Sequence, residues 1–281
     1  MKLLEQLRQL WPSRSAAKEW TIETITAFSS DKVGDSFDLQ VFLPPNYHTT
    51  NQYLPILFLN DGQDVEALGL ENTLKLSYQY ATVSDFILVA IQAVDRMHTY
   101  GTSQILDYKK RGSKAKAYGA FIVEELLPWL QLQYRVSTKP QAHTFAGFSL
   151  GGLSALDIVW NYPAVFGQVG VFSGSLWWRS QAFDPADPDA HRIMHDQVAA
   201  GPKKEGLRFW LQTGTLDEKE DRNNNGVIDA IDDTVDLIGI LRELGYQAIE
   251  YVEVEGGEHN PQTWGKVFPQ FLRWGFGRGR G

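Results

Sequence analysis

Hydrophobic and polar residues follow two different patterns in the first third of the chain. Residues 37–43 alternate apolar and polar side chains, which predicts a half-buried antiparallel strand. This strand is expected to pair with residues 20–28 as an edge hairpin. The runs 54–59 and 86–91 are apolar with no alternation. They are therefore expected to be central strands of a parallel sheet that is buried on both faces.

Strands and helices are expected to alternate in the rest of the chain. The apolar runs predict further strands at 143–146, 169–172, 207–212 and 248–254. The helical spacing predicts helices at 114–134, 150–160, 233–244 and 263–274. Pro128 is expected to kink or end the first of these helices. The alternation predicts an α/β fold, with a mostly parallel central sheet and helices on both faces. Ligands of such sheets bind at the carboxyl ends of the strands.

The whole chain, residues 1–281, is expected to form one domain, because no Pro/Gly/Ser-rich linker divides it. Residues 2–11 place four leucines on one helical stripe interrupted by polar residues, which predicts an N-terminal helix rather than a signal peptide. No run of about 18–20 apolar residues predicts a membrane span. The cytoplasm is the expected location, with the periplasm or secretion as alternatives.

A candidate nucleophile lies in Gly147-Phe-Ser149-Leu-Gly151, which fits the pattern G-x-S-x-G. In that pattern the glycines permit a sharp turn that holds a serine above the sheet. The segment directly follows one predicted strand and directly precedes a predicted helix, as the mechanism requires. We therefore interpret Ser149 as a nucleophile; the alternative is a structural glycine-rich turn.

A nucleophilic serine needs a histidine and an acid, which follow it in the chain order Ser, acid, His in α/β hydrolases. His259 follows a predicted strand and is the candidate base. His191 and His195 are four residues apart, without the Glu of a zinc motif, and are interpreted as a solvated helix face. Asp217 follows the strand 207–212 and is the candidate acid, with adjacent Glu218 as the alternative.

Several neighbouring residues complete the candidate site. The backbone N–H groups of Leu150, after the nucleophile, and Gln63, in an Asp-Gly turn after an earlier strand, are the expected oxyanion donors. The tryptophans next to these motifs either form the wall of a substrate pocket or lie in the core. They are Trp177, Trp178 and Trp264. Asp95, Arg96 and Tyr100 follow another strand end and border the cleft by the same reasoning.

These segments together resemble the esterase D/putative esterase family of α/β hydrolases, which includes feruloyl esterases, enterochelin esterases and mycolyltransferases. The resemblance covers about residues 35–275. The segments that carry it are 59–63, 135–136, 147–152, 173–178, 214–217 and 256–259 together with Trp264. It implies a triad of Ser149, Asp217 and His259, with Gln63 and Leu150 as oxyanion donors. The acid varies within the family.

A calcium-binding loop is predicted beside the candidate acid. Residues 221–232 match the twelve-residue EF-hand loop, with Gly226 at the sharp turn and an acid at the last position. The last acid is Asp rather than Glu, as in dockerin-type loops. The expected ligands are Asp221, Asn223, Asn225, Val227 and Asp232. We expect a structural Ca²⁺ in an insertion at about 218–233, where it orders the segment carrying Asp217; the alternative is a solvated acidic insert.

Composition narrows the remaining choices. The 281 residues include no Cys, which excludes thiolate chemistry, and the net charge of −8 disfavours nucleic-acid partners. Eight carboxylates against two cations place −6 of this charge in residues 217–236. We therefore expect a carboxylesterase with a small-molecule ester substrate, no organic cofactor and an undetermined oligomeric state. The alternatives are an acyltransferase with the same triad and a non-catalytic calcium-dependent binding module.

Overall fold

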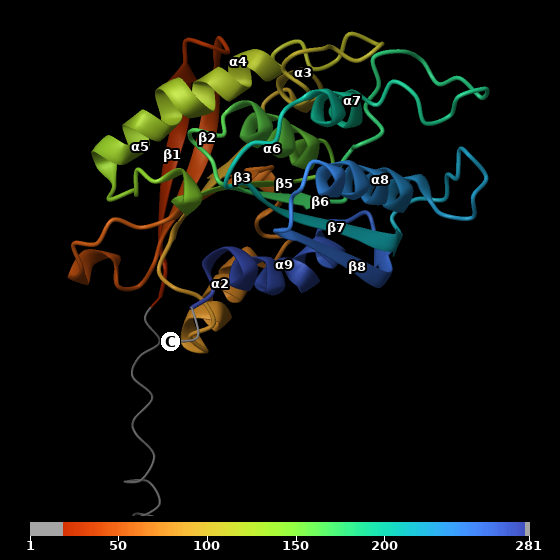
Figure 1. Ribbon diagram of the computed structural model, residues 1–281. Helices are drawn as coiled ribbons and strands as arrows, with labels where there is room; N and C mark the ends of the chain where they lie inside the picture. Colours follow the sequence, from red (N-terminus) through yellow and green to blue (C-terminus); the bar gives the residue numbers. More distant parts are fainter. Residues whose placement is uncertain (1–18, 279–281) are drawn as a thin grey trace, which may run out of the picture.

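The central feature of the computed structural model, which describes residues 19–278, is an eight-stranded sheet (Figure 1). The strands are β1 (Thr21–Ser30), β2 (Asp35–Leu43), β3 (Ile56–Asn60), β4 (Ile87–Ile91), β5 (His143–Phe148), β6 (Gln168–Phe172), β7 (Arg208–Leu216) and β8 (Ile249–Glu258). Their order across the sheet is β1-β2-β4-β3-β5-β6-β7-β8. Each strand predicted from the sequence is present, with boundaries shifted by a few residues.

Strand direction follows the hydrophobic pattern. The alternating strand β2 pairs antiparallel with β1 and with β4, which confirms the edge hairpin. From β4 to β8 every pairing is parallel. Strands β3, β4, β5 and β6 are buried along their whole length, as their continuous apolar runs predict. The carboxyl ends of the parallel strands therefore meet at one edge of the sheet.

Helices cover both faces of the sheet (Figure 1). They are α2 (Leu70–Gln79), α3 (Arg96–Thr99), α4 (Ala115–Ala120), α5 (Leu127–Gln133), α6 (Leu150–Asn161), α7 (Ile193–Ala200), α8 (Asp229–Glu243) and α9 (Pro261–Phe276). Helices α2 and α9 pack on one face, and α4 to α8 pack on the other. Short 3₁₀ helices lie at Tyr47–Thr49, Gly62–Asp64 and Pro140–Ala142. The α/β fold class is thus confirmed.

The helix expected at 114–134 does not end at Pro128. It runs as α4, a π-helical stretch over Phe121–Leu126, and α5, which continues to Gln133. Pro128 lies in the first turn of α5, where a helix tolerates a residue without an N–H. The helix therefore changes type shortly before the proline instead of ending there.

Two further expectations concern the N-terminal segment and membrane spans. The predicted N-terminal helix at 2–11 lies outside the described residues. Within residues 19–278, none of the helices combines the length and apolar character that a membrane span requires.

Candidate active site

Ser149 occupies a strained turn between β5 and α6. Its backbone angles are φ 53° and ψ −122°, and its N–H donates to the carbonyl of Phe172, 2.8 Å away. Both motif glycines are needed for close packing: a Cβ on Gly147 would lie 2.3 Å from the carbonyl oxygen of Gly151, and one on Gly151 would lie 2.3 Å from a carboxylate oxygen of Asp61. Such strain is typical of functional turns and presents the serine hydroxyl at the edge of the sheet.

The hydroxyl of Ser149 has one hydrogen-bond partner in the described chain, the hydroxyl of Ser175. The two Oγ atoms are 3.3 Å apart, and the N–H of Ser175 donates to the carbonyl of Ser149 at 3.1 Å. Ser175 lies in the loop after β6, in the same segment as Trp177 and Trp178. Its proximity to the candidate nucleophile depends on how β5 and β6 pair, which the sequence alone did not reveal.

Asp217 lies at the end of β7 with its side chain fully buried. Oδ2 accepts a hydrogen bond from the N–H of Gly214 at 2.9 Å, and Oδ1 accepts one from the hydroxyl of Ser173 at 3.0 Å. Burial raises the pKa of the carboxyl group, although these two hydrogen bonds and the charge of His259 act in the opposite direction. Oδ1 also lies 3.8 Å from Nδ1 of His259, so the structure brings these two candidates together.

Glu218, the alternative acid, lies in a different environment. The backbone N–H of Ala230, in the first turn of α8, favours its charged form. Burial, reinforced by the charge of Asp229, raises its pKa to about 7. No ion pair or hydrogen bond joins Glu218 to His259 within residues 19–278. The geometry therefore favours Asp217 as the acid.

His259 directly follows β8 and is 39% exposed. Burial lowers its pKa and the charge of Arg96 lowers it further, whereas Asp217 raises it. The separation of 3.8 Å from Asp217 exceeds a hydrogen bond. Among the described residues, Ser149 and His259 are likewise not hydrogen-bonded. Catalytic hydrogen bonds often tighten only when substrate binds.

Trp264 contacts both members of this pair, His259 directly and Asp217 through Ser173. The indole Nε1–H donates to the hydroxyl of Ser173 at 3.0 Å, and Ser173 in turn donates to Asp217. The same indole meets the ring of His259 edge-on at 5.3 Å and stacks on Phe148 at 4.9 Å. Only 5% of Trp264 is exposed. Of the two alternatives for Trp264, pocket wall or core, its burial matches the core.

The other two candidate pocket residues differ from each other. Trp178 is fully buried, with its ring against Gly101 and the guanidinium of Arg111 4.5 Å from its centroid. It is therefore a core residue and offers no surface to a substrate. Trp177 is 39% exposed and lies two residues after Ser175. It remains the candidate for contact with substrate.

A cavity of about 570 Å³ lies beside Trp177. It is bounded by residues from three loops at the carboxyl edge of the sheet. They are Tyr108, Trp177, Arg179, Phe183, Glu220, Asp221, Arg222, Asn224 and Asp229. Its volume is within the range of small-molecule sites, and three of the side chains that line it are aromatic. Part of the loop 221–232 thus forms one side of this cavity, and Trp177 lies on another side.

The two expected oxyanion donors lie on neighbouring strand ends. Leu150 is the first residue of α6, so its N–H has no acceptor within the helix, and none is supplied elsewhere in residues 19–278. Gln63 lies in the 3₁₀ turn after β3, and its side chain bridges Asp61 and the N–H of Ala93, each at 3.1 Å. The side chain is occupied in the loop, which leaves the backbone N–H as the group for an oxyanion.

The loop 221–232 is a tight turn with several internal hydrogen bonds. The carboxylate of Asp221 accepts from the N–H groups of Asn225 and Gly226 at 3.0 and 2.9 Å. Gly226 has φ 87° and Asn224 has φ 55°, so the turn uses the left-handed region twice. The last four residues of the loop form the first turn of α8.

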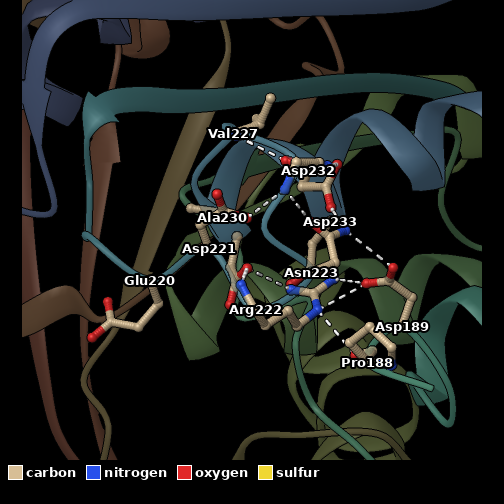
Figure 2. Close-up of polar contacts among 12 residues, drawn as sticks. Pro188, Asp189, Glu220, Asp221, Arg222, Asn223, Val227, Ala230, Asp232 and Asp233 are labelled. Atoms are coloured by element: carbon tan, nitrogen blue, oxygen red, sulfur yellow. Dashed lines mark hydrogen bonds and ion pairs between the residues drawn. The ribbon is translucent and has the colours of Figure 1, made fainter. Parts of the chain in front are cut away.

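Asp232 is hydrogen-bonded to two of the other predicted ligands (Figure 2). Its two carboxylate oxygens accept from the side-chain amides of Asn223 at 2.8 Å and Asn225 at 3.1 Å. Asn223 also donates to Asp189, at 3.1 Å. Oxygens of Asp189, Asp232 and Asp236 lie within 4.8 Å of one another. Asp189 belongs to the loop before α7, so sequence spacing gave no signal that it lies here.

Arg222 balances part of this negative charge. Its guanidinium pairs with Asp189 at 2.7 Å, Asp233 at 2.6 Å and Asp229 at 3.3 Å. The nearby Arg192 pairs with Asp233 at 2.6 Å as well as with Asp236. These ion pairs fix the loop against the start of α8 and against the segment that precedes α7.

The interpretation of His195 as part of a solvated helix face is wrong. His195 is 4% exposed, and its Nε2 lies 2.7 Å from the carbonyl of Asp233. Burial lowers its pKa to about 3, so the ring is neutral in the fold. Helix α7 packs against α8, which turns this residue inward; only His191, at φ 63°, lies partly exposed.

Known proteins resemble the chain in sequence and fold. The profile of the family described as "Putative esterase" matches residues 30–274. The protein YbbA of Bacillus subtilis (strain 168) is 23% identical over 247 residues, which cover 85% of this chain and 92% of YbbA. The iron(III) enterobactin esterase of Escherichia coli (strain K12) is 33% identical over 93 residues, 33% of this chain and 22% of that protein.

Solved structures share the arrangement of strands and helices. A ferulic acid esterase superposes with a TM-score of 0.69 at 17% identity and covers 92% of this chain and 98% of its own. The enterobactin esterase of Shigella flexneri superposes with a TM-score of 0.72 at 22% identity, covering 90% of this chain and 58% of its own. Because the family profile spans most of the sequence and these neighbours share its fold, the chain belongs to the "Putative esterase" family of α/β hydrolases and is a carboxylesterase.

Proposed function

We propose that the protein hydrolyses carboxylic esters through a triad of Ser149, His259 and Asp217. One observation carries the proposal: a serine in a strained strand-to-helix turn lies at the same sheet edge as an acid–histidine pair whose Oδ1 and Nδ1 are 3.8 Å apart. With Nδ1 facing the carboxylate, Nε2 is the nitrogen left to accept the serine proton. Asp217 then holds the ring in the correct tautomer and stabilises the imidazolium.

The proposed reaction has two stages. The Oγ of Ser149 attacks the ester carbonyl while His259 takes its proton, and the N–H groups of Gln63 and Leu150 bind the resulting oxyanion. Collapse of this intermediate releases the alcohol, which receives the proton from His259, and leaves an acyl group on Ser149. Water activated by His259 then attacks the acyl-enzyme and releases the acid.

Aromatic esters are the substrate class that the cavity supports best. Tyr108, Trp177 and Phe183 present aromatic surface in a volume of about 570 Å³. Two structural neighbours are named for aromatic acids or their derivatives: one is a ferulic acid esterase, and the other was crystallised in the presence of enterobactin. Stacking on these three side chains would bind the aromatic ring of such a substrate.

Covalent labelling tests the nucleophile directly. A fluorophosphonate is expected to modify Ser149, and Ser149→Ala is expected to abolish both labelling and turnover of p-nitrophenyl esters, by a factor on the order of 10⁶. Ser137→Ala, at a half-buried serine in the segment between α5 and β5, provides a matched control. An unlabelled wild-type protein would support a binding module instead. Transfer of the acyl group to an added alcohol in preference to water would support an acyltransferase.

We also propose that the loop 221–232 binds a structural Ca²⁺. The donor chemistry fits a hard cation, because Asp221, Asn223, Asn225 and Asp232 offer side-chain oxygens and Val227 offers a carbonyl. Asp189 supplies a further carboxylate within 4.8 Å of Asp232, which offsets the short reach of an Asp at the last loop position. A rise in melting temperature with calcium and its reversal by a chelator test this proposal.

A further inference from the structure

Asp61 is a fully buried carboxylate at the end of β3 with three hydrogen bonds from side chains. Arg96 donates to it twice, from Nε to Oδ1 at 2.7 Å and from Nη2 to Oδ2 at 3.1 Å. The side-chain amide of Gln63 donates to Oδ1 at 3.1 Å. The two-fold contact with Arg96 is the fork geometry that only a guanidinium provides. Burial lowers the pKa of Arg96, but its hydrogen bonds and the charge of Asp61 outweigh this and raise it.

The same guanidinium reaches the nucleophile turn. Nη2 of Arg96 also donates to the carbonyl of Phe148 at 3.1 Å, and Phe148 is the residue directly before Ser149. Arg96 itself begins α3, in the loop after β4. One side chain therefore ties together the carboxyl ends of β3, β4 and β5, which are neighbours in the sheet.

Direct packing makes this junction rigid. Asp61 has φ 62°, and its N–H donates to the hydroxyl of the buried Tyr100 at 3.1 Å. The side-chain amide of Asn60 donates to the carbonyl of Gly151 at 2.8 Å. Gly151 has no room for a Cβ because of the Asp61 carboxylate. The loop that carries Gln63 and the turn that carries Ser149 are thus in contact, and Arg96 closes the contact from the third side.

We propose that Arg96 is a positioning residue that fixes the Gln63 N–H relative to Ser149 by clamping Asp61 to the Phe148 carbonyl. The inference rests on the proposed function, because it assigns Gln63 and Leu150 to an oxyanion hole. The two N–H donors come from different strands. Their separation must match the oxyanion closely, since donors act at about 2.7–3.1 Å. A misplacement of about 1 Å can cost on the order of 10² in rate.

Arg96 has a second, electrostatic effect that makes the proposal testable. Its charge opposes protonation of His259, alongside burial, while Asp217 favours protonation. Removing the charge at position 96 therefore raises the pKa of His259. Because His259 acts as a base only when neutral, the acid limb of the pH–rate profile moves to higher pH. Replacing arginine with lysine keeps the charge and removes the fork.

The experiment compares Arg96→Lys, Arg96→Met and the exposed control Arg242→Met, with kcat, KM and the pH profile measured on one p-nitrophenyl ester. Both Arg96 variants are expected to lose about 10² in kcat with little change in KM. The acid limb is expected to stay in place in Arg96→Lys and to move to higher pH in Arg96→Met. Arg242→Met is expected to match the wild type. Circular dichroism melts confirm that each assay is run on folded protein.

Three results would overturn the proposal. Wild-type kcat in Arg96→Lys would show that the fork is not needed, and a loss confined to KM would make Arg96 a substrate contact. Identical acid limbs in Arg96→Lys and Arg96→Met would remove the electrostatic effect. If Arg96→Met does not fold, Asp61→Asn/Arg96→Met removes both charges and takes its place. If the wild type is neither labelled nor active, the proposed function is refuted together with the role of Arg96. If the wild type is active, these results refute only the role of Arg96.

Discussion

Oδ1 of Asp217 lies 3.8 Å from Nδ1 of His259, and the Asp217 side chain is fully buried. Two other groups already hold this carboxylate, the N–H of Gly214 and the hydroxyl of Ser173. Its orientation is therefore set before any substrate arrives. His259 is the more exposed partner, with 39% of its side chain exposed, so the pair has one fixed member and one that is less enclosed.

Asp217→Asn should separate the two candidate acids. The amide cannot stabilise an imidazolium, so we expect kcat to fall by a factor on the order of 10⁴ with the fold retained. Glu218→Gln is the matched control from the adjacent position. Its carboxylate is influenced by Asp229 and the N–H of Ala230 at the start of α8 rather than by His259, and we expect turnover near that of the wild type. Steady-state kinetics with a p-nitrophenyl ester measure both, and the reverse ranking would reassign the acid to Glu218.

The pH dependence of kcat/KM should report the pair of Asp217 and His259. Burial and the charge of Arg96 lower the pKa of His259, and Asp217 raises it. The histidine is an active base above its pKa, so activity is expected to fall as pH decreases through that value. In Asp217→Asn the raising charge is gone, and the acid limb is expected to move to lower pH. A limb that does not move in this variant would mean that another group controls it.

The regular part of the fold could be predicted because burial imposes a period on the sequence. Strands β3 and β4 are continuous apolar runs, and β2 alternates, as their positions in the sheet require. Helix α2 has no such signal, because two of its four buried positions are Thr73 and Ser77. The helix does not end at Pro128 for a related reason: a single residue does not show that the proline lies in the first turn of α5 after a π-helical stretch.

The candidate site was predictable where chemistry follows chain order, and not where it depends on packing. Ser149, Asp217 and His259 each follow a strand, and parallel strands bring those ends together. The depth of Trp178 and Trp264 and the inward turn of His195 depend on which helix covers them. The contacts of Asp189 with the loop 221–232 join segments more than 30 residues apart. Local sequence carries no information about such contacts.

Trp264→Phe should weaken the support under the triad while keeping the aromatic packing. The phenyl ring can still meet His259 and Phe148, but the hydroxyl of Ser173 loses its indole donor. We expect the free energy of unfolding to fall by about 1–3 kcal/mol, because a buried polar group loses its partner. We also expect kcat to fall, since Ser173 orients Asp217.

Trp274→Phe is the control for this substitution, because Trp274 lies on the same helix and is only partly buried. Urea denaturation and steady-state kinetics on both variants make the comparison. A Trp264→Phe enzyme with the stability of the wild type and its full kcat would show that the indole N–H has no role in positioning the acid.

Calcium should stabilise the protein through the loop 221–232. At a concentration about one hundred times its dissociation constant, an ion bound only to the folded state adds about 2.7 kcal/mol. A chelator is expected to remove this stabilisation and lower the melting temperature. Turnover is expected to fall as well. Asp229 is the first residue of α8, and the N–H of Asp229 donates to the carbonyl of Glu220 at 2.8 Å. This contact connects the loop to the segment that carries Asp217.

Asp232→Asn tests whether this response arises from the loop. Asp232 accepts from both Asn223 and Asn225, and an amide in its place supplies one neutral oxygen instead of a carboxylate. We expect the variant to lose the calcium-dependent rise in melting temperature. Asp196→Asn, an exposed acid on α7, is expected to keep it. Differential scanning fluorimetry in calcium, in magnesium and in chelator measures the three proteins.

A calcium response that survives in Asp232→Asn would locate the ion elsewhere. If the wild type shows no response, the loop is a hydrogen-bonded wall of the cavity beside Trp177 without an ion.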